Sequence, residues 1–383
     1  MMARGFAPIN SRSGRPPLNS LQVALLTPPG RAALAVVGVM GPGAAAAADR
    51  SFAARRGTAL AERADGTIAV GRWRSRPDEP GEEVVVVRRR ADLVEVHGHG
   101  GLAAPAAILA SLVETGAAAV TWQEWVARAG GSPIEIEARE ALGTAGGPRA
   151  ARILARQLSG ALRVEIEGIA RRAAAGDDTG VAVACGRLER AARVGLRLVR
   201  PWRVVLSGNV NCGKSSLANA LAGHARSLVS PLPGTTRDLV ETRLVVEGWE
   251  IDLVDTAGVR DGEPADPVER AGIARAHGAR ADADLVLRVV ESTDPALPRL
   301  RPSADELLVA TKADLLPAGA AVRPDAVSTS AVSGAGIAAL AARIADRLVP
   351  EARLEPDLLV GAVPFTLRQV AEIRRLASLA VRA

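Results

Sequence analysis

The glycine-rich segment GNVNCGKSS, residues 208–216, combines residue types that can hold a phosphate. Its spacing is G-x-x-x-x-G-K-[ST], in which backbone N–H groups surround the phosphates and the following helix adds the positive end of its dipole. We expect the Lys214 ammonium to bridge the β- and γ-phosphates and the Ser215 hydroxyl to ligate Mg²⁺. The residues predicted to contact nucleotide here are Asn211, Cys212, Gly213, Lys214, Ser215 and Ser216.

The use of lysine supports a site at this loop. The chain has 48 lysines and arginines together, of which only Lys214 and Lys312 are lysines. Arginine replaces lysine readily on a solvated surface, but a broad planar guanidinium cannot take the place of a compact ammonium between two phosphates. Both lysines fall in motifs of one kind of site, so lysine is kept where its chemistry is required.

Two segments further along the chain supply groups for the γ-phosphate and for Mg²⁺. PGTTRD, residues 233–238, places the hydroxyls of Thr235 and Thr236 on a loop loosened by glycine, as in a segment that closes on bound nucleotide. In DTAG, Asp255 could hold Mg²⁺ through water and the Gly258 amide could meet the γ-phosphate. This order of motifs is typical of a GTPase.

A second pair of segments predicts guanine recognition. An apolar strand ends in TKAD, where Asp314 would accept hydrogen bonds from the N1–H and amino group of guanine, and the stem of Lys312 would cover the base. Ser330 and Ala331 follow a later strand and would present a backbone amide to guanine O6. Most GTPases have Asn where this chain has Thr311, which predicts the loss of one hydrogen bond in the base loop and weaker guanine affinity.

The group that would drive hydrolysis is less evident. Ras-type enzymes orient water with a glutamine directly after the DxxG motif, but that position is Val259, which cannot do so. Asn211, with carbonyls of the segment around PGTTRD, could hold a monovalent cation in the place usually filled by an arginine finger. Glu269 could position water, although its place in the first turn of a helix also fits an ordinary solvated glutamate, which is the simpler account from position alone.

Composition limits the class of protein. A chain of 383 residues is long enough for two or three domains, and its 48% hydrophobic content with no Tyr predicts cores of aliphatic side chains. Two cysteines cannot form a disulfide framework and fit a reducing cytoplasm, which is the predicted location. No long apolar run predicts a signal peptide or a membrane span. The net charge of +6 permits an anionic partner such as RNA.

Taken together, the motifs resemble a known family. GNVNCGKSSLANALAG, PGTTRD, DTAGVR and VERAGIARA are similar to the G domain of the tRNA modification GTPase family MnmE, also called TrmE. TPPGRAALAVVGVMGP (27–42) and LVEVHGHGG (93–101) are similar to the two signatures of that family's N-terminal domain. The similarity covers residues 20–125 and 201–350.

The resemblance implies roles for residues at matching positions. Ser215 and Thr236 would ligate Mg²⁺, and Glu269 would be the general base acting through water. Catalytic groups would be Glu269, Lys214 and Thr236, and K⁺ would be bound by Asn211, Ser230, Thr235 and the Leu232 carbonyl.

The same resemblance implies partners and cofactors. The protein would form a homodimer through its N-terminal and G domains, with K⁺ as the activating charge. It would work with an MnmG-type flavoprotein to modify C5 of the wobble uridine in certain tRNAs. A folate, 5-formyltetrahydrofolate, would be the one-carbon donor, bound by the N-terminal domain.

Some positions depart from the family. A folate-contacting arginine would align with Gly38, and a lysine expected near Ser132 to Ile134 is missing, whereas Glu95 is retained. Family members end in a Cys-Ile-Gly-Lys tail, but this chain ends in SLAVRA with no cysteine after Cys212. We therefore expect a truncated, divergent member.

The predicted fold is multi-domain, α/β and α+β. Residues 1–19 are expected to be disordered, residues 20–125 to form a small α+β domain, and residues 126–200 and 351–383 a reduced helical domain. A Ras-like P-loop G domain, residues 201–350, is inserted in it. The helical domain is expected to contain one helix over RAARILARQLSGALRVEIEGIARR, one over CGRLERAARVGLRLVR, and a third over residues 365–381 that pairs with them.

The predicted function is a K⁺-stimulated GTPase with a role in tRNA modification. Two alternatives stay open. One is a regulatory GTPase that does not modify tRNA but switches partners or assists ribosome assembly. The other is a scaffold that binds nucleotide without turnover.

Overall fold

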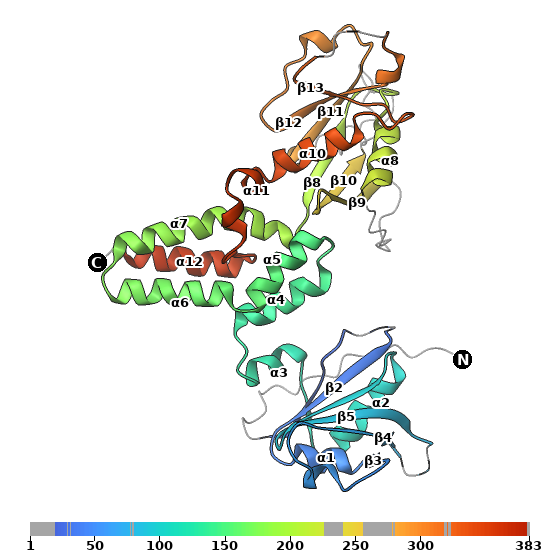
Figure 1. Ribbon diagram of the computed structural model, residues 1–383, viewed down its shortest axis with the longest axis vertical. Helices are drawn as coiled ribbons and strands as arrows, with labels where there is room; N and C mark the ends of the chain where they lie inside the picture. Colours follow the sequence, from blue (N-terminus) through green and yellow to red (C-terminus); the bar gives the residue numbers. More distant parts are fainter. Residues whose placement is uncertain are drawn as a thin grey trace. The chain divides into compact units, whose positions relative to one another are not determined.

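The computed structural model describes residues 20–28, 30, 32–76, 78, 80–225, 240–255, 278, 280–317, 320 and 323–380. The chain divides into two compact units, residues 1–136 and 137–383. Each unit contains a β-sheet (Figure 1). Among the described residues, the sheet of the first unit has seven strands and that of the second has six.

The first unit is built on a mostly antiparallel sheet. Its elements are β1 (Gln22–Leu25), β2 (Leu34–Met40), α1 (Ala44–Asp49), β3 (Phe52–Ala54), η1 (Leu60–Glu62), β4 (Thr67–Trp73), β5 (Glu82–Arg90), β6 (Leu93–His99), α2 (Ala103–Glu114), β7 (Ala118–Ala119) and α3 (Trp122–Arg128). The strands follow the order β3-β4-β5-β6-β2-β1-β7, and only β1 and β7 pair in parallel.

The two faces of this sheet are covered differently. Because side chains alternate along a strand, each strand has one set of residues on either face. Val37 and Val39 of β2 lie on the face that packs with the alanines of α1 and with Ile108 and Leu112 of α2. The opposite face packs with Trp125 of α3. The helix α3 therefore occupies the face that α1 and α2 leave open.

The six-stranded sheet of the second unit is mostly parallel. Its elements are β8 (Trp202–Ser207), α8 (Lys214–His224), β9 (Val240–Val246), β10 (Trp249–Asp255), β11 (Leu285–Glu291), η3 (Leu297–Arg299), β12 (Glu306–Thr311), η4 (Ala313–Leu315), β13 (Ala326–Ser328) and α10 (Ile337–Leu348). The strand order is β13-β12-β11-β8-β10-β9, and only β9 runs antiparallel to its neighbour. All six residues of β12 are buried, which is typical of a central parallel strand.

Parallel strands bring chemistry to one edge. Ser207, Asp255, Glu291 and Thr311 are the last residues of β8, β10, β11 and β12. In a parallel sheet these carboxyl ends lie along one edge, which is where ligands bind in α/β folds.

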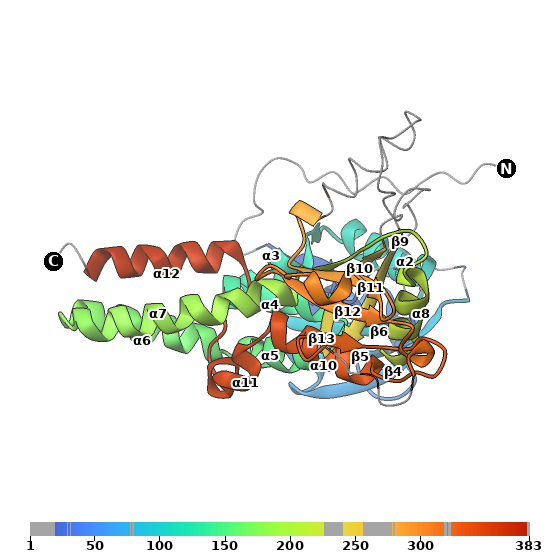
Figure 2. The same cartoon turned by 90° about the horizontal axis from the view of Figure 1, so that it is seen from above.

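The remaining helices come from both sides of this sheet in the sequence. They are α4 (Pro133–Thr144), α5 (Pro148–Leu158), α6 (Ala161–Ala174), α7 (Asp178–Gly195), η2 (Leu196–Leu198), α11 (Glu351–Leu354), η5 (Pro356–Leu359) and α12 (Leu367–Ala380). The last of them, α12, packs against α6 and α7 (Figure 2). Gln157 of α5 also holds the chain that leads to α12, because its amide donates to Gly361 O (3.1 Å) and accepts from Val363 N (3.1 Å).

The prediction of one continuous helix over RAARILARQLSGALRVEIEGIARR is wrong. The structure ends α5 at Leu158 and starts α6 at Ala161. Between them Gly160 has φ 98°, a left-handed conformation that ends a helix and that glycine adopts at low cost. The apolar periodicity on both sides of this glycine hid the break.

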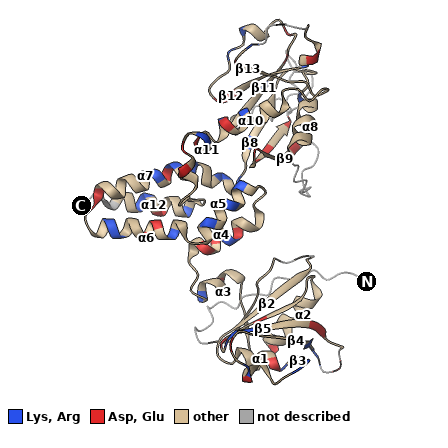
Figure 3. Ribbon diagram, in the orientation of Figure 1, with Lys and Arg blue, Asp and Glu red and all other residues tan. Residues whose placement is uncertain are grey.

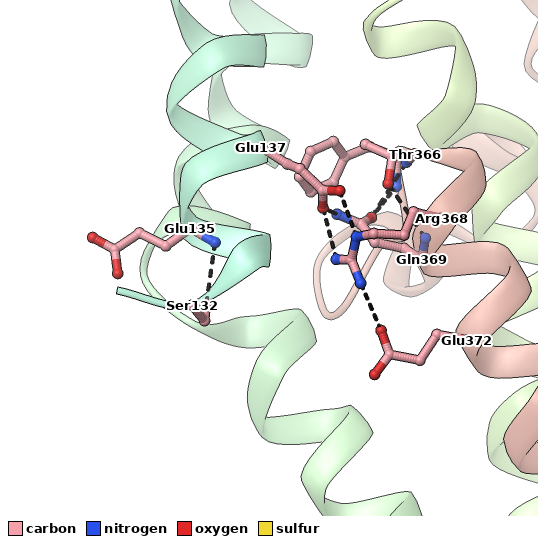
Figure 4. A network of polar contacts seen from close by, with 8 residues as sticks. Ser132, Glu135, Glu137, Thr366, Arg368, Gln369 and Glu372 are labelled. Carbon is pink, nitrogen blue, oxygen red and sulfur yellow. Dashed lines mark hydrogen bonds and ion pairs between the residues drawn. The ribbon is translucent and has the colours of Figure 1, made fainter. Parts of the chain in front are cut away.

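A polar network joins the start of α12 to α4 (Figure 4). The Glu137 carboxylate accepts hydrogen bonds from Arg368 Nε (2.6 Å) and Nη2 (2.9 Å), and from Gln369 Nε2 (2.6 Å). Arg368 also donates to Glu372 (2.9 Å), and Gln369 Oε1 accepts from Phe365 N (2.8 Å). Gln369 is fully buried. A two-pronged ion pair of this kind is stronger than a single neutral hydrogen bond, so Glu137 fixes where α12 begins.

We expect Glu137→Ala to destabilise the second unit by about 1–3 kcal/mol, because it leaves the buried Gln369 amide without its acceptor and removes two of the hydrogen bonds of Arg368. The measurement is urea denaturation followed by circular dichroism. Glu189→Ala is the matched control, since its pair with Arg374 is exposed and should change the free energy of unfolding by less than about 1 kcal/mol. Equal effects of the two changes would contradict the role given to Glu137.

Candidate functional site

Lys214 is the first residue of α8, and its side chain turns back into the loop that joins β8 to this helix. Its side chain is only 6% exposed, and its Nζ donates to the carbonyls of Gly208 (2.9 Å) and Asn209 (2.7 Å). A buried ammonium needs such partners, because burial of an unsatisfied charge is costly. Both partners are neutral, so the positive charge is not cancelled and remains available to an anion.

The backbone of the loop has the shape that wraps this ammonium. Asn211 has φ 65° and Gly213 has φ 93°, both in the left-handed region. At Gly208 the loop passes so close to β11 that a Cβ atom would lie 2.2 Å from Val289 O. Position 208 therefore requires glycine because there is no room for a side chain. Position 213 favours glycine because its backbone is left-handed.

Ser215 and Asp255 form the part of the site that fits Mg²⁺. The Ser215 hydroxyl donates to Asp255 Oδ2 (2.6 Å). The other carboxylate oxygen, Oδ1, is buried and has no hydrogen-bond partner among the residues that the structure describes. A hydroxyl beside a carboxylate with an unused oxygen is the kind of oxygen ligand set that Mg²⁺ prefers.

Thr311 connects the base-recognition strand to the phosphate loop. Its hydroxyl, at the end of β12, donates to Cys212 O (2.6 Å) and lies 3.2 Å from Val290 O. Thr311 is 5% exposed. The sequence alone predicted only a lost hydrogen bond at this position, whereas the structure shows a threonine that bonds to the loop. Through its hydrogen bond to the nearer partner, Cys212 O, Thr311 supports the phosphate loop.

The Lys312 ammonium pairs with Glu291, the last residue of β11. The backbone at Lys312 is left-handed, with φ 57°. Glu291 was not predicted as a site residue, because nothing in the local pattern at the end of an apolar strand marks it. Its position at the sheet edge beside β12 was the only available signal.

Backbone hydrogen bonds hold the two predicted base-binding segments together. Ala313 N donates to Thr329 O (3.0 Å), and Thr329 N donates to Ala310 O (2.8 Å). Asp314 is the middle residue of η4, directly after this contact. Ser330 is 1% exposed and its hydroxyl accepts from Ser333 N (3.2 Å), whereas Ala331 is exposed. The TKAD and Ser330-Ala331 segments are thus neighbours, as the motif order predicts.

Cys212 and Ser216 complete the described part of the loop. Cys212 is buried, and this burial raises the pKa of its thiol despite the Lys214 ammonium nearby, which acts in the opposite direction. The thiol therefore stays protonated at neutral pH. Ser216 and Asn211 are exposed. Ser230, Leu232, Thr235, Thr236, Gly258 and Glu269, which were also predicted to belong to the site, lie outside the described residues.

Glu95 lies on β6 of the first unit. It accepts a hydrogen bond from Arg89 Nη2 (2.8 Å), and His97 Nε2 lies 3.2 Å from the same oxygen. Burial opposes its ionised form, but the hydrogen bonds and charges of Arg89 and His97 together outweigh burial and lower the pKa of Glu95.

Among the described residues, no helix is long and apolar enough to cross a membrane.

Comparison with known proteins shows the family and the enzyme class of this chain. A family described as "50S ribosome-binding GTPase" matches residues 203–315. The tRNA modification GTPase MnmE of Thermus thermophilus is 35% identical over 92% of this chain and 86% of its own length. MnmE of Methylorubrum populi is 36% identical over 81% of this chain and 77% of its own length. Among solved structures, the G domain of the T. maritima FeoB iron transporter is 30% identical and covers 39% of this chain and 98% of that one, with a TM-score of 0.29.

These sequence matches confirm two of the predictions. The chain is a GTP-hydrolysing enzyme, and it is a mixed α/β protein with a P-loop GTPase domain. GTP and Mg²⁺ follow from that class.

We expect Thr311→Val to weaken the binding of GTP and GDP alike by about tenfold or more, because it leaves the buried Cys212 carbonyl without its donor and loosens the phosphate loop. Titration with a fluorescent GDP analogue measures the Kd. Thr115→Val is the control, since the Thr115 hydroxyl bonds to Leu112 O in the first unit. An unchanged Kd in a folded Thr311→Val protein would show that the Thr311–Cys212 hydrogen bond is not needed for nucleotide binding.

Proposed function

We propose, for a chain that belongs to the MnmE family of tRNA modification GTPases, that GTP hydrolysis in its G domain serves the C5 modification of wobble uridines in tRNA. The observation that carries the proposal is the buried Lys214 ammonium beside the Ser215–Asp255 pair, at the carboxyl edge of the parallel sheet. This arrangement offers one ammonium for the phosphates and one set of oxygen ligands for Mg²⁺. A bound nucleoside triphosphate requires both.

Different residues of the site would contact different parts of the bound GTP. Lys214, the loop amides and the start of α8 would hold the β- and γ-phosphates. Ser215 would ligate Mg²⁺ with Thr236, and Asp255 would hold it through water; the ion neutralises charge that develops on the phosphates. Asp314 would accept from the guanine ring, while Lys312 covers the base. Ser330 and Ala331 would present an amide to O6, and Gly258 an amide to the γ-phosphate.

Hydrolysis needs a group in place of the glutamine that Val259 replaces. In our proposal Asn211, Ser230, Thr235 and the Leu232 carbonyl bind K⁺, and Glu269 acts as general base through water. Support comes from Asn211, which is exposed on the loop in a left-handed conformation. Its side chain therefore has no buried structural role that would prevent it from serving as a ligand.

We expect GTP turnover to be faster in K⁺ than in Na⁺, and Asn211→Ala to remove that difference without abolishing the Na⁺ rate. Glu269→Ala should lower kcat by about a hundredfold, as for the loss of a general base. Phosphate release in matched KCl and NaCl buffers is the measurement. Asn219→Ala, an exposed asparagine on α8, is the control and should behave as wild type. Equal wild-type rates in both salts would refute the K⁺ site.

The distribution of charge favours RNA as a partner. Residues 137–200 and 351–383 hold 17 arginines and 11 acidic residues, whereas residues 201–350 hold 16 basic and 19 acidic residues. The positive excess of the second unit thus falls on residues 137–200 and 351–383, which include α5, α6, α7 and α12; Figure 3 shows the charged residues of these helices. Since neutralisation of phosphates dominates nucleic-acid affinity, these helices are the proposed contact for tRNA.

A second copy of the chain and an MnmG-type flavoprotein are the other proposed partners. The predicted domain boundaries also remain part of this proposal.

Nucleoside mass spectrometry of tRNA tests the role directly. In a strain without this gene, we expect C5-modified wobble uridines to be lost and to return when the gene is restored. A gene carrying Lys214→Ala should fail to restore them, because the nucleotide site would be lost. Unchanged modification, in a genome with no second gene of this family, would overturn the tRNA role.

One observation favours a second candidate. The family that matches residues 203–315 is described as a ribosome-binding GTPase, which fits a regulatory role in ribosome assembly. In that case the deletion strain would keep its modified uridines and show altered ribosomal subunit profiles instead.

A further inference from the structure

One large side chain covers the sheet face opposite α1 and α2. Trp125 of α3 is 5% exposed and packs with Ala24 and Met40. Its ring lies directly over the backbone of Gly38 on β2, where an added Cβ atom would be 2.5 and 2.7 Å from two of the ring carbons. The indole, together with Leu26 Cδ1 at 2.9 Å from the same added atom, therefore fills the space that any side chain at position 38 would need.

The strand register places Glu95 beside this covered position. Gly38 pairs with Ala24 on β1 and with Glu95 on β6. Residues directly opposite each other in an antiparallel pair lie on the same face, so the three form one row across the sheet. Trp125 covers the Gly38 part of that row, and Glu95 lies next to it.

The helix that carries the indole is held at both ends. Thr121 and Glu124 form a reciprocal capping box at its start. At its end, Arg128 Nη2 donates to Ser20 O (2.9 Å), just before β1. The position of Trp125 is thus set by a capped helix that is tied to the sheet, and the ring is not a side chain resting loosely on a surface.

The carboxylate in the row is already in use. Glu95 is bound by Arg89 and faces His97, and both interactions favour its ionised form. A pteridine would have to donate its ring N–H and amino groups to this carboxylate. It would also need the space beside it, and the arginine that the family has at the position aligned with Gly38 is absent.

These residues do not fit the folate that the family implies. We infer that this chain has no tetrahydrofolate site at the row formed by Ala24, Gly38 and Glu95, because the Trp125 indole fills the Gly38 position and Arg89 and His97 already engage the Glu95 carboxylate. The domain then keeps the sheet and its packing without the cofactor. The inference rests on the first unit alone, so it stands whether or not the chain modifies tRNA.

Calorimetric titration of the full chain with 5-formyltetrahydrofolate tests the inference. We expect no saturable heat up to about 1 mM, while GDP titrated into the same preparation binds with one site per chain and shows that the protein is active. Saturable folate binding near one molecule per chain would overturn the inference.

A double-mutant cycle tests the fit of the ring over Gly38. We expect Gly38→Ala to lower the Tm of the first unit by about 5 °C or more, since a methyl group cannot fit against the indole. In a Trp125→Leu background the same change should have little effect, because the ring is gone. Gly101→Ala, where no atom lies within 4 Å of the added Cβ, is the control. Shifts that simply add would show that the indole does not fill this position.

Discussion

The site of this GTPase depends on burying one positive charge. The Lys214 ammonium is enclosed by the loop that precedes it, and its partners are the carbonyls of Gly208 and Asn209. For these carbonyls to turn inward, Asn211 and Gly213 must adopt left-handed backbone conformations, and Gly208 must lie flat against β11. A charge held by neutral dipoles keeps its attraction for an anion, which explains why the chain retains lysine here when arginine serves almost everywhere else.

A loop shaped in this way needs support from residues far away in the sequence. Thr311 bonds to Cys212 O from β12, and Asp255 meets Ser215 from β10. The opposite end of β10 is anchored to the helices, because Glu250 accepts from Gly146 N (3.2 Å) and the Arg149 guanidinium lies 5.4 Å from the Trp249 ring centre. Burial raises the pKa of Glu250 against the pull of Arg243. The strand that carries Asp255 is therefore fixed at both ends.

What the sequence could predict follows from this division between local and distant contacts. Lys214, Ser215 and Asp255 were predictable because motif spacing places the first two at the start of the helix that follows β8 and the third at the end of β10, and parallel strands bring those ends together. The Thr311–Cys212 and Lys312–Glu291 contacts join residues that no local pattern relates. The break at Gly160 was hidden for a different reason, because one glycine within an apolar period is compatible with either a helix or its end.

Gly38 shows why family roles must be transferred one residue at a time. The match to one relative covers 92% of the chain, and the phosphate loop keeps its P-loop pattern, yet Gly38 stands where the resemblance to the family implies an arginine. A missing side chain alone would leave a cavity, and cavities in a packed protein are costly. Here the indole of Trp125 fills that volume, so the face is as well packed as a core. A position that has been filled in this way has a structural role of its own, and that role competes with any ligand for the same space.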